Sequence, residues 1–139
     1  MNPIEARSIV NEFYNKALTV NTETTPTAVL ERIAADDFES VNGQESKPKA
    51  QLAKQVEGFW KLIPDLKWVP QDFVIDGDKV VVRSVASGSP KGPFMGMTLD
   101  GTRSFRIDTI DIHELANGRI ARVRHLEDWA TAIRQLGAK

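Results

Sequence analysis

The order of sequence patterns predicts an α+β domain in which helices cover one face of a curved, mostly antiparallel sheet. Three observations lead to this prediction. Amphipathic helix patterns fill the first part of the chain, alternating strand patterns with tight turns follow, and a short helix pattern comes last. Helices followed by an antiparallel meander are typical of α+β folds. A sheet curved in this way leaves a concave hollow.

Three helix patterns precede the long strands. The first begins at Pro3, after an asparagine cap, and we expect it to run to about Leu18. The second is short and has Thr25 as its cap. The third begins near Pro48 and stops at Pro64. Between the second and third helices, DFESV (37–41) indicates a brief strand and NGQESKP (42–48) a turn.

Four longer strand patterns follow the third helix. Asp76-Gly77 and Asn117-Gly118 indicate tight hairpin turns between neighbouring strands. The longest connection, residues 87–101, joins the second strand to the third. The strand patterns cover residues 66–75, 79–87, 103–115 and 119–129, and a terminal helix pattern covers residues 130–137.

Composition limits the function classes. The chain has 139 residues, a formal net charge of −1 and no cysteine, which excludes disulfides, thiolate metal sites and a cysteine nucleophile. No stretch of about 18 apolar residues occurs. We therefore expect a single domain over residues 1–139, a cytoplasmic location, and neither nucleic acid nor membrane as a partner.

Side chains able to do chemistry gather on the last predicted hairpin. The sequence has no glycine-rich phosphate loop, no Gly-x-Ser-x-Gly turn and no His-Glu-x-x-His pair. It has two histidines, and both lie on this hairpin. Asp111 and His113 belong to the first strand, and His125 and Glu127 to the second.

The turn at Asn117-Gly118 decides which of these side chains share a face, because a one-residue slip moves a side chain to the other side of the sheet. A two-residue turn would place His125 opposite Ile110, with Asp111 pointing away. A three-residue turn with a glycine bulge would place His125 opposite Thr109. Both turns suit the Asn-Gly pair, and we favour the three-residue turn.

The three-residue turn makes Asp111 and His125 diagonal neighbours on one face. A carboxylate beside an imidazole raises its pKa, which suits a base that removes a proton next to a carbonyl group. A buried polar pair without a catalytic role is the alternative. The shared face would hold Thr109, Asp111, His113, Ala121, Val123, His125 and Glu127. The opposite face would hold Ile110, Ile112, Ile120, Arg122, Arg124 and Leu126.

A metal site is a further alternative for the same hairpin. Asp111, His113 and His125 offer a carboxylate and two imidazoles, as in mononuclear iron enzymes. His113 lies near the turn and His125 several residues up the partner strand, so a common centre would require distortion. We expect no metal.

Several short motifs occur in an order that resembles the SnoaL-like polyketide cyclase, or ester cyclase, family of the nuclear-transport-factor-2-like (NTF2-like) superfamily. The resemblance covers about residues 36–137. It rests on Ile63-Pro64-Asp65, Gly92-Pro93-Phe94-Met95-Gly96, Asp100-Gly101-Thr102-Arg103, Ile110-Asp111-Ile112, Asn117-Gly118-Arg119-Ile120, Glu127-Asp128-Trp129 and Arg134-Gln135-Leu136-Gly137.

The resemblance implies a cone-shaped barrel, made of a curved mixed sheet and about three N-terminal helices around a pocket, and a homodimer formed through the outer face of the sheet. It also implies ring closure by intramolecular aldol condensation without a cofactor. An acidic residue on the last long strand and a polar residue on its neighbour carry that reaction. His125 and Asp111 are the best matches, with the two residue types exchanged. Relatives also place a histidine where this chain has Val41 and Asn42.

These observations lead to three hypotheses. The first is a cofactor-free enzyme that cyclises or isomerises a small carbonyl-containing, apolar or polyketide-like molecule, with His125 and Asp111 as catalytic residues. The second is a non-catalytic protein that binds such a molecule, and the third is a dimeric interaction domain of the same fold. The candidate substrate-binding residues are Phe13, Asn42, Trp60, Phe94, Met97, Thr109 and Glu127.

Overall fold

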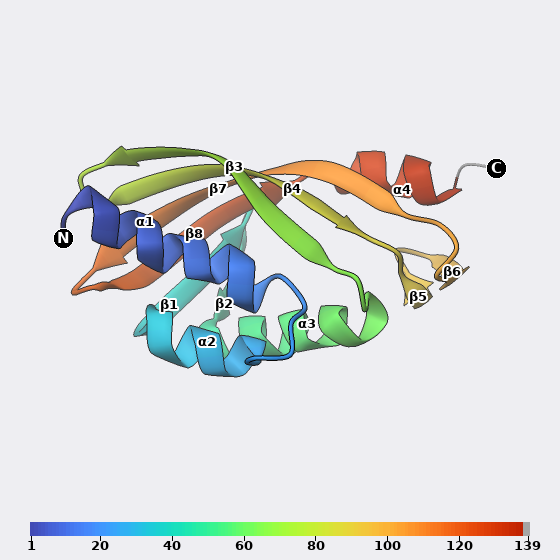
Figure 1. The fold of residues 1–139 in the computed structure, drawn as a ribbon, viewed down its shortest axis with the longest axis horizontal. Helices are drawn as coiled ribbons and strands as arrows, with labels where there is room; N and C mark the ends of the chain where they lie inside the picture. The colour runs from blue at the N-terminus through green and yellow to red at the C-terminus, as the bar shows by residue number, and fades with distance from the viewer. Residues whose placement is uncertain (138–139) are drawn as a thin grey trace.

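The computed structural model describes residues 1–137 and consists of a curved six-stranded sheet with helices packed against it (Figure 1). Its elements in chain order are α1 (Pro3–Glu12), the π-helical turn η1 (Phe13–Ala17), α2 (Pro26–Ile33), β1 (Ala34–Asn42), β2 (Glu45–Pro48), α3 (Lys49–Leu62), β3 (Lys67–Asp76), β4 (Lys79–Gly88), β5 (Lys91–Phe94), β6 (Met97–Asp100), β7 (Phe105–Ala116), β8 (Arg119–Glu127) and α4 (Trp129–Gly137). The predicted α+β class is confirmed.

Polar caps start the first two helices where the sequence predicts them. The side chain of Asn2 accepts a hydrogen bond from the backbone N–H of Glu5 at 2.8 Å, and that of Thr25 accepts one from Ala28 at 3.2 Å. The first helix ends in a π-helical turn, in which the N–H of Leu18 bonds to the carbonyl of Phe13. This wider turn brings two consecutive aromatic residues, Phe13 and Tyr14, into the interior.

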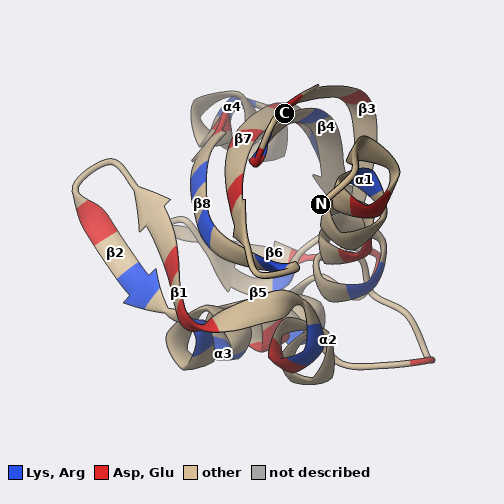
Figure 2. Ribbon diagram, turned by 90° about the vertical axis from the view of Figure 1, so that its left-hand side faces the viewer, with Lys and Arg blue, Asp and Glu red and all other residues tan. Residues whose placement is uncertain are grey.

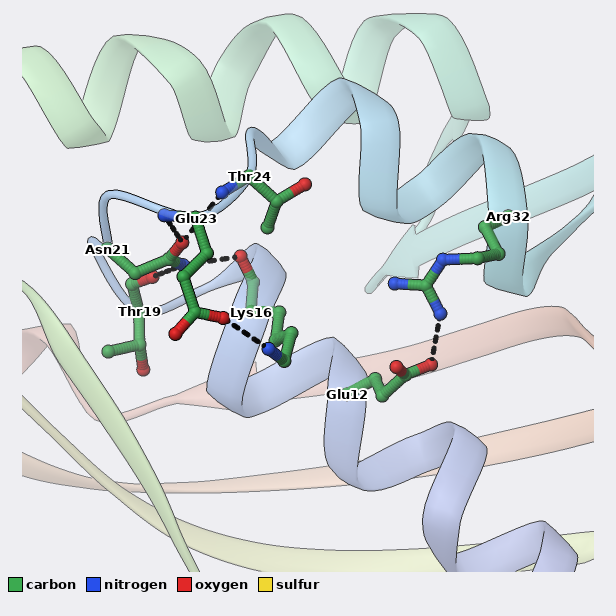
Figure 3. A network of polar contacts seen from close by, with 7 residues as sticks. All are labelled: Glu12, Lys16, Thr19, Asn21, Glu23, Thr24 and Arg32. Atoms are coloured by element: carbon green, nitrogen blue, oxygen red, sulfur yellow. Dashed lines mark hydrogen bonds and ion pairs between the residues drawn. The ribbon is translucent and has the colours of Figure 1, made fainter.

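A polar network holds the loop between η1 and α2 (Figure 3). The amide of Asn21 donates to the carbonyls of Lys16 and Thr19, and its oxygen accepts from the N–H groups of Glu23 and Thr24. Lys16 also pairs with Glu23 at 2.8 Å. The loop therefore satisfies its backbone groups locally while the chain reverses direction between the two helices.

The large sheet has the strand order β2-β1-β8-β7-β4-β3. Strands β3, β4, β7 and β8 form the predicted antiparallel meander, and β1 pairs parallel to β8. Figure 2 shows this sheet strongly curved, with α1 beside β3, α2 and α3 beside β1, and the β1–β2 hairpin extending from one side. The sheet is not closed, because β2 and β3 are its two edges.

Three stretches contain more strand than the sequence patterns indicate. The brief strand expected at 37–41 is the nine-residue β1, and the turn expected at 42–48 contains β2. The connection 87–101 contains the β5–β6 hairpin. Strand β1 lies between β2 and β8, and its parallel pairing with the distant β8 extends it beyond its local pattern.

The favoured three-residue turn between β7 and β8 is wrong. Ala116 pairs with Arg119, and Asn117 and Gly118 both have positive φ angles of 53° and 78°, which is the geometry of a two-residue turn. The register then shifts, since Leu115 pairs with Ile120 whereas Glu114 pairs with Arg122. Ala121 is the extra residue of a β-bulge in β8.

The bulge brings Asp111 directly opposite His125, instead of the diagonal arrangement expected. The bulge also reverses the alternation along β8: before it the even-numbered Ile120 faces inward, and after it the odd-numbered residues do. Ile120, expected on the outer face, is fully buried, whereas Ile110, Ile112 and Leu126 on the same predicted face are exposed.

None of the helices described within residues 1–137 is long and apolar enough to cross a lipid bilayer.

Gly88, at the end of β4, packs against the end of α3 and should not tolerate a side chain. A Cβ there would lie 2.3 Å from the Cγ2 atom of Ile63, so we expect Gly88→Ala to lower the free energy of unfolding by about 1–3 kcal/mol. Chemical denaturation measures this change. The control is Gly58→Ala on the exposed side of α3, where a Cβ meets nothing within 4 Å and where we expect a gain of about 0.5–1 kcal/mol.

Candidate active site

The inward faces of β7 and β8 bring the candidate catalytic residues together. Alternation along β7 turns Thr109, Asp111 and His113 inward, and each is buried. Across the ladder, Asp111 pairs with His125 and Thr109 with Glu127. The two strands therefore place two carboxylates and an imidazole side by side.

Both ring nitrogens of His125 have hydrogen-bond partners. Nδ1 lies 2.7 Å from a carboxylate oxygen of Glu127, and Nε2 lies 2.8 Å from the hydroxyl of Ser40 on β1. Burial lowers the pKa of His125, but the hydrogen bond and charge of Glu127, together with the charge of Asp111, outweigh it and raise the pKa above its ordinary value. The raised pKa favours the protonated form of His125, in which Nδ1 donates to Glu127.

Asp111 is 3 % exposed and accepts a hydrogen bond on Oδ2 from the hydroxyl of Tyr14 at 2.6 Å. Burial raises its pKa, the Tyr14 hydrogen bond lowers it, Glu127 raises it and His125 lowers it, with a result of about 7. A carboxyl group with this pKa exchanges protons readily at neutral pH.

Tyr14 connects Asp111 to the second histidine. Its hydroxyl lies 2.7 Å from Nε2 of His113, which is fully buried. Burial, helped by the charge of His125, lowers the pKa of His113 to about 3, so this imidazole is neutral at pH 7. Burial and Asp111 raise the pKa of Tyr14, which therefore keeps its proton.

A cavity of about 210 Å³ opens beside Asp111, His125 and Glu127. Its wall is mostly apolar and aromatic, and β2 contributes a lysine and a glutamate. The lining residues are Phe13, Leu18, Asn42, Glu45, Lys47, Leu52, Gln55, Val56, Phe59, Trp68, Asp111, His125, Glu127 and Trp129.

The structure places five of the sequence-predicted residues on this cavity, namely Phe13, Asn42, Asp111, His125 and Glu127. It places the other four elsewhere: Trp60, Phe94, Met97 and Thr109.

The reasons for these other positions are local. The indole of Trp60 donates to the carbonyl of Ala17 and holds α3 against η1. Phe94 is buried against other aromatic rings, and Met97 borders a separate surface hollow beside the end of α4. Thr109 lies behind the cavity, where its hydroxyl accepts from the Trp68 indole at 3.1 Å.

Sequence reasoning missed Tyr14, Ser40 and Lys47. Tyr14 had a detectable signal, because it lies four residues after the buried Val10 on the same helical face and is the only tyrosine in the chain. Ser40 and Lys47 had none. Ser40 approaches His125 because β1 pairs parallel to β8, a long-range pairing that leaves no local pattern. Lys47 follows because β2 pairs with β1 in a local hairpin.

Asp111, His125 and Glu127 are also close enough to bind a metal ion, since one ligand atom from each lies within 4.8 Å of the others. His113 cannot join them, because it is enclosed behind Asp111 and bonded to Tyr14. Both nitrogens of His125 and one oxygen of Asp111 already have hydrogen-bond partners. We therefore interpret the three side chains as an acid–base group and not as metal ligands.

The sequence motifs predict the family of this chain, and a family profile confirms the prediction. The sequence profile described as SnoaL-like polyketide cyclase matches residues 8–136. The chain belongs to the SnoaL-like polyketide cyclase family. A search of the curated proteins found no match.

Several solved structures share the NTF2-like fold of this family member. A protein of Jannaschia Sp. CCS1 assigned to the SnoaL-like polyketide cyclases superposes with a TM-score of 0.86 at 18% identity, covering 100% of this chain and 97% of its own. TsrD from Streptomyces laurentii has a TM-score of 0.82 at 22% identity and coverages of 100% and 99%. IdmH from Streptomyces antibioticus has a TM-score of 0.80 at 22% identity, covering 96% of this chain and 99% of its own.

The buried ionisable pair of this SnoaL-like domain makes its stability depend on pH in two opposing ways. Asp111 has a folded pKa of about 7 against an ordinary 3.8, so ionising it as pH rises through this range lowers the free energy of unfolding. His113 has a folded pKa of about 3 against 6.5, so its contribution is lost as pH falls through that range.

We expect Asp111→Asn to remove the first effect and keep the second. The free energy of unfolding of this variant should rise more steeply between about pH 4 and 7 than that of the wild type. Denaturant titrations at several pH values measure the slope. Asp108→Asn, on the exposed side of β7, should follow the wild type, and equal slopes for all three proteins would contradict the burial of a protonated Asp111.

Proposed function

We propose that this protein is a cofactor-free acid–base enzyme that cyclises or isomerises a small, enolisable carbonyl compound. One observation carries the proposal: Asp111, His125 and Glu127 lie together on the wall of an otherwise mostly apolar cavity. An apolar cavity with a few convergent polar groups and shifted pKa values is typical of an active site. The cavity of about 210 Å³ is smaller than those that take drug-sized ligands, which favours a small substrate.

The geometry supports distinct roles for the three side chains. Asp111 would remove a proton from the carbon next to the carbonyl, and the bonding electrons would move onto the carbonyl oxygen as an enolate. The positive charge of His125, held by Glu127 and Ser40, would stabilise that negative charge. In isomerisation the proton returns to another carbon. In cyclisation the enolate carbon bonds to a second carbonyl carbon, whose oxygen takes up the proton.

Non-catalytic binding of the same kind of molecule is the second candidate. Asn42 lies on the cavity wall near the position at which relatives have a histidine, and both nitrogens of His125 are engaged by protein groups. These two features would suit a cavity that orients a carbonyl compound without reacting with it.

Proton exchange separates the two candidates without knowledge of the natural substrate. The probes are small cyclic ketones and β-keto esters in D₂O, with NMR to follow deuterium uptake next to the carbonyl and ligand-detected NMR to follow binding. We expect catalysed exchange to rise as Asp111 ionises around pH 7 and to fall when His125 loses its proton. Asp111→Asn should slow exchange roughly 10²–10⁴-fold.

Asp108→Asn is the matched control, since this aspartate lies on the exposed side of the same strand. Binding of a probe without exchange would support the second candidate. Unchanged exchange in Asp111→Asn would contradict the proposed role of Asp111.

We also propose that the protein forms a homodimer through the outer face of β7 and β8. Ile110, Ile112 and Leu126 are 50%, 37% and 69% exposed there. Ile110 pairs across the ladder with Leu126, and Ile112 lies two residues from Ile110 on the same face, so the apolar side chains are contiguous. Val41 and Gly43 border the same shallow hollow. An exposed apolar patch of this kind supports a subunit contact.

Leu126→Glu should convert the dimer to monomers, because a subunit contact would bury the introduced charge without a partner. Sedimentation at micromolar concentration measures the mass. Val74→Glu is the control, since Val74 is 62% exposed but lies on β3 at the sheet edge. A wild-type protein that sediments as a monomer would contradict the dimer.

The cytoplasmic location and the absence of nucleic-acid and membrane partners remain predictions from the sequence.

A further inference from the structure

Tyr14 and His113 form a buried pair directly behind Asp111. Tyr14 and His113 are both 0% exposed, and neither lines the cavity. The hydroxyl of Tyr14 lies 2.6 Å from Oδ2 of Asp111 and 2.7 Å from Nε2 of His113. The three groups therefore form one hydrogen-bonded chain from the core to the cavity wall.

The other nitrogen of His113 decides the direction of this chain. Nδ1 is fully buried and has no hydrogen-bond partner within the described residues. An unpaired N–H in this position would cost more than an unpaired lone pair, because buried donors are almost always satisfied. The neutral imidazole therefore carries its proton on Nε2 and donates to the oxygen of Tyr14. Tyr14 must then donate its own proton to Asp111.

The two oxygens of Asp111 consequently differ. Oδ2 accepts from Tyr14, and a proton on this oxygen would weaken it as an acceptor of that bond, so protonation at Oδ1 is favoured. Oδ1 has no hydrogen-bond partner within residues 1–137, yet it is not among the fully buried unpartnered atoms, which are Ser84 Oγ and His113 Nδ1. Oδ1 therefore keeps access to the cavity that Asp111 lines.

We propose that Tyr14 and His113 are positioning residues that restrict proton exchange by Asp111 to Oδ1, the oxygen facing the cavity. The inference rests on the proposed function, in which Asp111 is the base. His113 holds the Tyr14 hydroxyl in the donating orientation, and Tyr14 occupies Oδ2. A substrate proton can then reach Asp111 at one defined atom, which fixes the geometry of the transfer.

Other charged groups also face Asp111 and must be separated from the effect of Tyr14. Glu127 and His125 approach Asp111 from β8 and shift its pKa through their charges. The charge of Lys47, on β2, lowers the pKa of His125. None of these three groups bonds to Tyr14 or His113. Replacing the Tyr14 hydroxyl therefore leaves their contacts in place.

NMR of the ligand-free protein tests the proposal independently of any catalysis. With ¹⁵N-labelled histidine, His113 should show the neutral tautomer protonated on Nε2 across pH 5–8, with His125→Ala assigning the two rings. A His113 protonated on Nδ1, or one that becomes charged in this range, would overturn the proposal. This measurement uses the wild-type fold and needs no substitution at Tyr14.

The second measurement follows the carboxyl carbon of Asp111, assigned with Asp111→Asn. Tyr14→Phe removes a donor to the carboxylate, so the titration midpoint of Asp111 should rise by roughly one pH unit. The control is Thr109→Val, which removes a hydroxyl on the same strand face that bonds to Trp68 and not to Asp111, and should leave the midpoint unchanged. An unchanged or lower midpoint in Tyr14→Phe would overturn the proposal, whereas absent turnover would overturn only the proposed function.

Discussion

The direct pairing of Asp111 with His125 depends on one extra residue in β8. The two-residue turn at Asn117 and Gly118, continued without interruption, would set His125 opposite Ile110 and turn Asp111 to the other face. The bulge at Ala121 changes the register by one residue, so both side chains point into the hollow of the sheet. The same residue turns Ile120 into the core while leaving Leu126 outside. The acid–base group and the exposed apolar patch are thus two results of one local irregularity.

Burial then determines how the grouped side chains ionise. A carboxylate oxygen of Glu127 lies 2.7 Å from Nδ1 of His125 and helps to raise the pKa of this histidine. Among residues 1–137 no cation bonds to Asp111, which is almost fully enclosed, so burial raises its pKa to about 7. His113, enclosed further, stays neutral and contributes a donor instead of a charge. On strand β7, burial therefore raises the pKa of Asp111 and lowers that of His113, two residues away on the same face.

The helices supply what the sheet lacks. The π-helical turn at the end of α1 buries Phe13 and Tyr14 together, and places the first on the cavity and the second behind Asp111. Helix α3 provides apolar wall residues such as Leu52 and Val56. The apolar surroundings maintain the shifted pKa values, because they keep water from screening the buried carboxyl and imidazole groups.

The sequence by itself determined the α+β class, the helix starts, the antiparallel meander and the family, because caps, turns and periodicity act over a few residues. It also indicated Asp111, His125 and Glu127 as one group, although the turn expected to join them was wrong. The bulge, the parallel contact that brings Ser40 to His125, and the position of Tyr14 were decided by tertiary structure alone. The contacts of Ser40 and Tyr14 join residues about 85–100 positions apart, and only packing of the complete fold selects them. The bulge lies within one hairpin, but its position depends on which side chains the curved sheet buries.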